Sequence, residues 1–177
     1  MGRGLIEDRE ELEALFDELT EELSLLGTSV EVVMVGGAWM LWHSQRMSTR
    51  DVDSARTLGP GLEDAIGKVA ERHDLSNRWL NDSAAAFWPS NASYEVCRVV
   101  YQKQNLEVRT PAPEVIFVMK LCRADPQDRE DLVTLWPLCR FDGPEVAAAA
   151  FRNAYPHAPE DEYLADYIAD VAEDAAG

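Results

Sequence analysis

The chain has 177 residues, of which 33 are acidic and 16 are lysine or arginine, so its formal net charge at pH 7 is −17. This length predicts one domain that buries roughly 70% of its unfolded surface. The charge argues against a broadly basic nucleic-acid-binding protein, because an acidic surface repels a phosphate backbone. Any RNA contact would have to be small or use a local basic patch.

The sequence also lacks the marks of membrane and secreted proteins. No apolar run approaches the roughly 20 residues of a membrane span, and the first residues lack the apolar core of a signal peptide. Three scattered cysteines suit a reducing compartment, and three widely spaced histidines give no zinc-site spacing. We therefore expect a cytoplasmic protein that does not associate with membranes.

The first part of the chain alternates helical and extended patterns. Apolar residues at helical spacing, preceded by acidic residues, predict a first helix that ends before Gly27. The predicted elements in order are a helix over 7–26, a strand over 30–35, a short helix over 38–45, a strand over 50–55, a helix over 62–72 and a weaker helix over 76–87.

The second part begins with an extended pattern and continues with helices. The predictions are a hairpin of strands over 94–101 and 106–110, then helices over 111–123, from Asp125-Pro126 onward, over 144–155 and over 159–175. We expect one α/β (α+β) domain over 1–177, with a small mixed, twisted sheet backed by helices. Residues 1–110 would form the sheet-containing core and 111–177 a C-terminal helical part.

Two short motifs belong to the first two predicted strands, one directly after the first strand and the other within the second. Gly36-Gly37 lets the backbone pass close to a ligand phosphate, since no Cβ intervenes. If a helix starts there, its free N–H groups face the same place. Asp51 and Asp53 lie on either side of Val52, so on a strand both carboxylates project from one face, with Cα atoms roughly 6.6 Å apart. Carboxylates and substrate phosphates together suit magnesium, which is the chemistry of nucleotide transfer.

These motifs resemble the signature of the nucleotidyltransferase superfamily of the DNA-polymerase-beta type. Val35-Gly36-Gly37 is followed by a spacer of thirteen residues and then by Asp51-Val52-Asp53. The chain looks most similar to the abortive-infection toxin nucleotidyltransferases and their small bacterial relatives. Their Arg-x-Ser/Thr-x-Asp-x-Asp run is matched by Arg46, Ser48, Thr49, Asp51 and Asp53. Ser54 departs from the apolar residue that is commoner at its position.

The resemblance implies a Mg²⁺ or Mn²⁺ site formed by Asp51, Asp53 and a third carboxylate on a later strand. Glu107 is the first candidate and Glu95 its competitor, although alternation on an edge strand produces the same pattern without function. An NTP such as ATP would bind at Gly36, Gly37, Arg46, Ser48, Thr49 and Lys120. For Arg46 an ion pair with an aspartate is an equal alternative.

A second informative stretch lies in the C-terminal part. Lys120 interrupts an apolar helical run, so its ammonium group must reach solvent or meet an anion. Asp128 and Asp131 are three residues apart and share a helix face, although Asp128 has a structural alternative in the capping of its own helix. The toxin family carries a helical lysine followed by an Asp-x-x-Asp-Leu run. By that resemblance Lys120 binds phosphates, and Asp131 or Asp128 contacts the acceptor or takes its proton.

The leading hypothesis is a magnesium-dependent enzyme that moves a nucleoside monophosphate from an NTP to a hydroxyl of RNA or protein. The toxin resemblance implies a toxin–antitoxin or phage-defence role, with an antitoxin protein as partner. Two alternatives stay open. One is a non-catalytic nucleotide-binding or interaction module on the same fold. The other is a small-molecule enzyme similar to the aminoglycoside or lincosamide nucleotidyltransferases, whose acidic clefts suit cationic acceptors.

Overall fold

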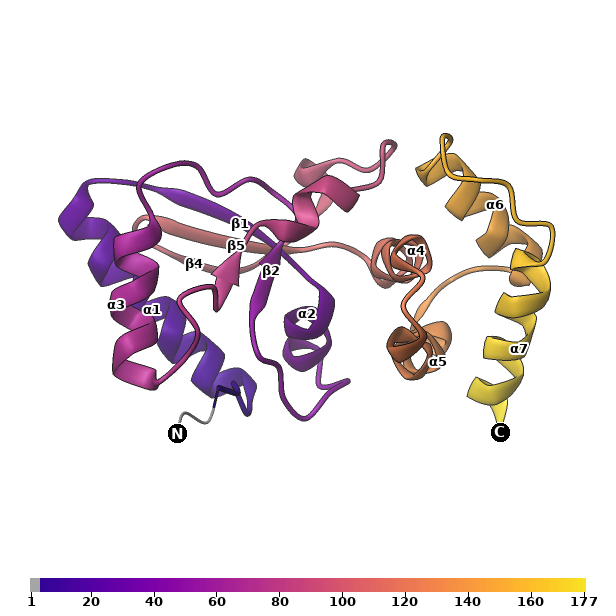
Figure 1. Ribbon diagram of the computed structural model, residues 1–177, viewed down its shortest axis with the longest axis horizontal. Coiled ribbons are helices and arrows are strands. Elements are labelled where there is room, and N and C mark those ends of the chain that lie inside the picture. Colours follow the sequence, from indigo (N-terminus) through magenta and orange to yellow (C-terminus); the bar gives the residue numbers. More distant parts are fainter. Residues whose placement is uncertain (1–3) are drawn as a thin grey trace. The chain divides into compact units, whose positions relative to one another are not determined.

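The computed structural model describes residues 4–177 and shows a mixed α/β fold, which confirms the predicted class (Figure 1). The helices are α1 (Arg9–Leu26), α2 (Gly36–Trp42), α3 (Glu63–His73), α4 (Pro113–Arg123), α5 (Arg129–Leu135), α6 (Pro144–Ala154) and α7 (Leu164–Ala176). The strands are β1 (Val30–Val35), β2 (Val52–Ser54), β3 (Leu80–Asn81), β4 (Arg98–Lys103) and β5 (Leu106–Thr110). No helix in this described part of the chain is long and apolar enough to cross a membrane.

The five strands form one mixed sheet with the order β3-β2-β1-β5-β4. The central strand β1 is antiparallel to β2 and parallel to β5. β2 and β3 are parallel, and β4 and β5 form an antiparallel hairpin at the other edge. A central strand is covered on both faces, which explains why β1 is an almost continuous run of valine and methionine.

Helices α1 and α3 pack against each other, and α1 also contacts β4 and β5 (Figure 1). The core beneath them receives alternate side chains of β1, namely Val30, Val32 and Met34. Asp8 caps α1 by accepting a hydrogen bond from the backbone N–H of Glu11 at 2.7 Å, and Gly27 ends it in the left-handed conformation. One face of the sheet is therefore committed to this core, and Val33 and Val35 of the opposite face of β1 are buried as well.

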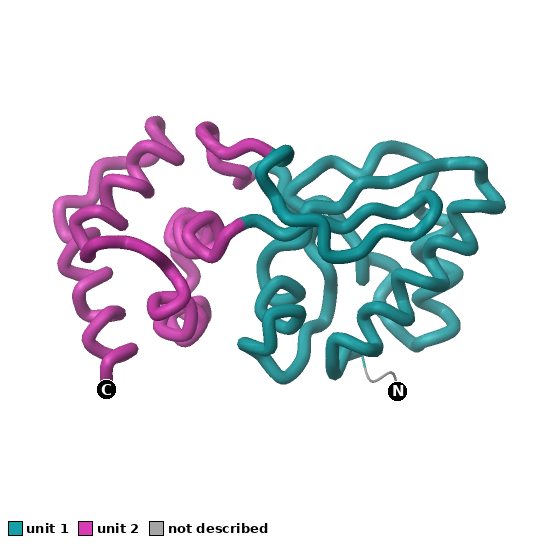
Figure 2. Tube along the Cα trace, turned by 180° about the vertical axis from the view of Figure 1, so that it is seen from behind, with its two compact units in different colours: residues 1–86, 94–111 teal, residues 87–93, 112–177 magenta. Residues whose placement is uncertain are grey.

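The chain divides into two compact units (Figure 2). Unit 1 contains the sheet with α1, α2 and α3 and runs to Ala86, resuming over Tyr94–Pro111. Unit 2 consists of Ala112–Gly177 together with the short segment Phe87–Ser93. That segment is fixed within unit 2 by Ser90, whose backbone N–H and hydroxyl both donate to the Ala154 carbonyl at 3.0 and 2.9 Å.

Unit 2 is built from helices around aromatic and alanine side chains. The ring of Phe117 on α4 lies 5.6 Å from that of Trp136 and 5.7 Å from that of Phe141. Ala147 and Ala148 are fully buried, and α6 contacts both α4 and α7. Small residues at these positions let helices approach closely.

Four predicted elements differ clearly from the observed ones, and one of them is the last helix, which was predicted over 159–175 and begins only at Leu164. The predicted helix over 76–87 is instead a turn, strand β3 and a 3-10 helix over Ser83–Phe87. Residues 94–96 form a 3-10 turn, so β4 begins only at Arg98. The helix predicted after Asp125 starts as the 3-10 turn Pro126–Asp128 before α5. The two 3-10 turns are closed by their own backbone, with the Cys97 N–H donating to the Tyr94 carbonyl at 3.1 Å and the Asp128 N–H to the Asp125 carbonyl at 2.9 Å.

Candidate functional site

The turn between β1 and α2 depends on Gly36. Its φ of 63° lies in the left-handed region, which glycine adopts without strain. A Cβ added there would lie 3.2 Å from Oδ2 of Asp53. The contact follows from the register of β1 and β2, which pairs Val35 with Asp53. The sheet thus brings the glycine turn and the second aspartate together.

Gly37, the first glycine's neighbour, is tightly surrounded by polar side chains. A Cβ on Gly37 would lie 2.5 Å from Nη1 of Arg46 and 2.7 Å from Oγ1 of Thr49. A side chain at this position would therefore have to displace Arg46 and Thr49. Two further residues of the predicted motif, Arg46 and Thr49, gather at the same turn.

The loop that carries these side chains is held by its backbone. Ile6 and Thr49 form a two-way antiparallel bridge, with N···O distances of 2.7 and 2.9 Å. The Thr49 hydroxyl donates to the carbonyl of Asp51 at 3.0 Å. Ile6 is fully buried, so the bridge ties the loop to the core. Ser48 is partly buried in this loop.

Asp51 and Asp53 lie on either side of the fully buried Val52, and both are partly exposed. Strand alternation places the Asp53 carboxylate on the sheet face opposite the core, and Asp51 immediately precedes β2. Ser54, the departure from the family pattern, is fully buried, and its hydroxyl accepts the Val33 N–H at 3.2 Å and donates to the Arg56 carbonyl at 2.7 Å. A serine is thus accommodated without an unpaired polar group.

The structure does not bring Glu107 to this pair. Glu107 is level with Glu31, four residues before the partner of Asp53 on β1. It also lies two strands away, which separates the Cα atoms of Glu107 and Asp53 by roughly 16 Å. Its carboxylate instead accepts hydrogen bonds from Arg109 at 2.5 Å and Gln102 at 3.1 Å. Glu95 lies on an exposed 3-10 turn, and among residues 4–177 no three His, Cys, Asp or Glu side chains form a metal-binding group.

The residue beside Asp53 on the outer strand is Asn81. The parallel pairing of β2 with β3 places Asn81 directly level with Asp53. Its amide oxygen accepts the Ser83 N–H at 3.0 Å, and its amide nitrogen donates to the Arg78 carbonyl at 3.2 Å. Sequence reasoning missed this position because residues 76–87 show no strand pattern. The available signal was the buried anchor Trp79, whose Nε1 donates to the Ile66 carbonyl at 3.0 Å.

In unit 2 the structure brings Lys120, Asp128 and Asp131 together. All three are buried, and Nζ of Lys120 lies 3.1 Å from Oδ1 of Asp128 and 2.8 Å from Oδ2 of Asp131. The lysine therefore meets anions within the protein. Both carboxylates thus share Lys120 as a partner.

The surroundings of this cluster are ordered by Asp125. Its side chain accepts the Gln127 N–H at 3.0 Å, which lowers the pKa of Asp125, as does Arg123 at 3.2 Å. Oδ2 of Asp128 is buried without a hydrogen bond, and Nε of Arg123 lies 3.5 Å from it. Lys120 also borders a cavity of about 370 Å³ within unit 2.

Comparison with protein families gives a single assignment. The family described as "Nucleotidyltransferase of unknown function (DUF6036)" matches residues 10–164. Comparisons with curated proteins and with solved structures find no match. The matched residues contain the glycine turn, the aspartate pair and the lysine–aspartate cluster. The chain therefore belongs to this family of nucleotidyltransferases.

Proposed function

We propose that the protein transfers a nucleoside monophosphate from an NTP to a hydroxyl acceptor in a magnesium-dependent reaction. The observation that carries this proposal is the convergence of Asp53, Arg46 and Thr49 on Gly36 and Gly37 at the β1–α2 turn, where an added Cβ would lie 2.5 to 3.2 Å from their side-chain atoms. A cation beside closely approachable backbone suits the phosphates of a nucleotide. The family assignment supports the same reaction class.

The donor set fits a hard cation. Asp51 and Asp53 offer two carboxylates on one sheet face, and Mg²⁺ typically takes one or two protein carboxylates with phosphate oxygens and water. Such an ion would neutralise phosphate charge and lower the pKa of the attacking hydroxyl. The amide oxygen of Asn81 is the neutral candidate for the place that a third carboxylate takes in relatives. Arg46, Ser48 and Thr49 would bind and orient the phosphates.

For unit 2 we propose that Asp131 accepts the proton of the acceptor hydroxyl and that Lys120 holds its carboxylate in place. Asp128 is the alternative base. The two short contacts of Lys120 support the positioning role. Binding of nucleotide phosphate by Lys120, the role implied by the toxin resemblance, would require it to exchange one aspartate for the phosphate.

The acceptor follows from the toxin resemblance, which favours RNA or protein and an antitoxin partner. The test is incubation of the full chain with Mg²⁺ and each NTP labelled at the α-phosphate, with bacterial RNA or protein as acceptor. We expect label in one acceptor fraction, reduced at least about 100-fold by Asp53→Asn. Asp142→Asn is the matched control, because Asp142 is an exposed loop residue. Equal labelling by Asp53→Asn would contradict the proposal.

A second candidate is a nucleotide-binding module without transfer activity. The observation that favours it is the absence, among the described residues, of a third acidic side chain beside Asp53. In that case the protein would bind Mg²⁺–NTP, and no acceptor fraction would take up label from any nucleotide.

A further inference from the structure

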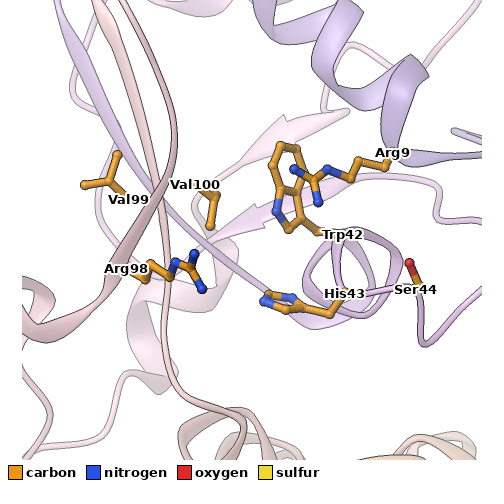
Figure 3. A pocket seen from close by; sticks show the side chains of 7 residues that line it. All are labelled: Arg9, Trp42, His43, Ser44, Arg98, Val99 and Val100. Atoms are coloured by element: carbon orange, nitrogen blue, oxygen red, sulfur yellow. The ribbon is translucent and has the colours of Figure 1, made fainter.

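Unit 1 contains a basic pocket of about 370 Å³ that the proposed reaction does not use (Figure 3). It is bordered by Arg9 of α1, the end of α2 and the start of the edge strand β4. Glycine residues 36 and 37 begin α2, whereas His43 follows its last residue, so the pocket lies about 10 Å from the glycine turn along the helix. The aspartate pair and the pocket are thus separate features of the same unit.

The pocket gathers positive charge in a chain whose net charge is −17. Arg98 is exposed on β4, and among residues 4–177 its guanidinium has no hydrogen bond or ion pair. The guanidinium of Arg9 lies 4.2 Å from the Trp42 ring centroid and has Glu13 at 3.0 Å on the exposed side. One arginine is therefore pre-positioned by stacking, and the other lacks a counter-ion.

His43 adds a third polar group with a defined tautomer. Its Nδ1 lies 2.9 Å from the Trp39 carbonyl, which can only accept, so Nδ1 carries the proton. The ring stacks on Trp39 with centroids 4.0 Å apart, and its free edge points toward Arg98 (Figure 3). Nε2 therefore offers a lone pair to the pocket.

The charges around His43 favour its neutral form. Burial lowers the pKa of His43, and the nearby cations Arg9 and Arg98 lower it further, while the hydrogen bond to Trp39 acts in the opposite direction. Glu13, which pairs with Arg9, is the acidic group that borders this set. An anion bound between the two arginines would offset their lowering of the His43 pKa. A proton would then be held between the anion and His43.

We propose that this pocket binds a phosphate monoester group, with Arg98 and Arg9 contacting its charged oxygens and Nε2 of His43 sharing one proton with it. Guanidinium groups bind phosphate through paired N–H donors. A phosphate monoester has a second ionisation near pH 6, so near neutral pH it can carry the proton that faces Nε2. Sulfate and carboxylate carry no such proton at neutral pH. The inference does not depend on the transfer reaction.

The test uses histidine NMR signals of the full chain during titration with inorganic phosphate in Mg²⁺-free buffer. The chain has three histidines, so the signals of His73 and His157 are internal controls. We expect only His43 to shift saturably. Arg98→Gln should weaken the affinity at least about tenfold, because a charged hydrogen-bond donor is lost. Arg140→Gln, at an exposed loop arginine, should leave it unchanged.

The shared proton gives a second readout. As pH rises above the second ionisation of phosphate, the complex holds up to one proton more than the separated partners, so the phosphate affinity should fall between pH 6 and 8. Calorimetry on His43→Gln should show a weaker pH dependence. Sulfate should bind less tightly than phosphate at pH 7. An unshifted His43, an equal affinity in Arg98→Gln, or equal binding of sulfate would each overturn the proposal.

Parallel titrations distinguish two sources of the phosphate group, namely nucleic acid and a small phosphorylated molecule. A short RNA with a 5′-phosphate should bind more tightly than a nucleoside monophosphate if the source is nucleic acid, and the 5′-hydroxyl RNA should not bind. Equal binding of the RNA and the monophosphate points to a small phosphorylated molecule. Asp53→Asn should retain phosphate binding, which separates this pocket from the proposed catalytic metal site.

Discussion

At the scale of single residues, Gly36 and Gly37 are needed for different physical reasons. Gly36 adopts a left-handed backbone, so a side chain there strains the turn itself. Gly37 has an ordinary backbone but no space, because Arg46 and Thr49 occupy the position of a Cβ. The two substitutions therefore separate backbone strain from loss of the polar arrangement.

We expect Gly37→Ala to displace Arg46 and Thr49 and to weaken Mg²⁺–NTP binding at least about tenfold, since one charged contact is lost. Gly36→Ala, by contrast, should strain the backbone of the turn and lower the free energy of unfolding by roughly 1 kcal/mol. Gly67→Ala is the matched control. Gly67 lies inside α3, where the atom nearest to an added Cβ would be Oδ1 of Asn77 at 4.0 Å. The substitution should therefore stabilise the protein by about 0.5–1 kcal/mol. Urea unfolding and calorimetry measure these effects, and unchanged nucleotide affinity in Gly37→Ala would contradict the assigned site.

At the scale of elements, Lys120 of α4 forms buried ion pairs with Asp131 of α5 and with Asp128 of the 3-10 turn before α5. Removing one partner of a buried ion pair leaves uncompensated charge. Lys120→Met should therefore lower the free energy of unfolding by about 3 kcal/mol, and the triple variant Lys120→Met/Asp128→Asn/Asp131→Asn should recover much of that loss. Equal unfolding midpoints for wild type and Lys120→Met would show that the cluster does not hold the helices.

Strand β4 and helix α1 meet through Tyr101, whose hydroxyl donates to Asp17 at 2.7 Å. Burial, together with this hydrogen bond, raises the pKa of Tyr101 to about 12. Because the folded state favours the neutral phenol, its contribution to stability is complete below the ordinary value of 10 and is lost as pH rises toward 12. Tyr101→Phe should lose less stability than wild type between pH 9 and 11. Parallel pH profiles of the two would contradict this.

Sequence patterns predicted those elements whose apolar spacing is set by the core. The bounds of α1, β1 and α3 agree with the prediction within about two residues. The glycine turn and aspartate pair were recognisable because their chemistry requires fixed residue types. β3 and the separation of Glu107 from Asp53 were not, because both depend on which strands pair. A two-residue strand held by Trp79 has no periodicity of its own.

At the scale of the whole molecule, the net charge of −17 limits how the protein meets nucleic acid. Counter-ion release increases with the number of phosphates that a protein neutralises. We expect RNA affinity to change less than about threefold between short and long oligonucleotides, with a salt slope of about −1 to −2. Fluorescence anisotropy at several salt concentrations measures both. Affinity that grows steeply with RNA length would indicate an extended basic surface.

We propose that Asp51 and Asp53 hold the metal ion of a nucleotide that binds at the β1–α2 turn. The most direct measurement is calorimetric titration of each NTP with Mg²⁺ into the wild type and into Asp51→Ala/Asp53→Ala, with folding of both checked by circular dichroism. We predict saturable binding of at least one NTP by the wild type and none by the double variant. Equal binding by both proteins, or no binding by folded wild type, would contradict the account.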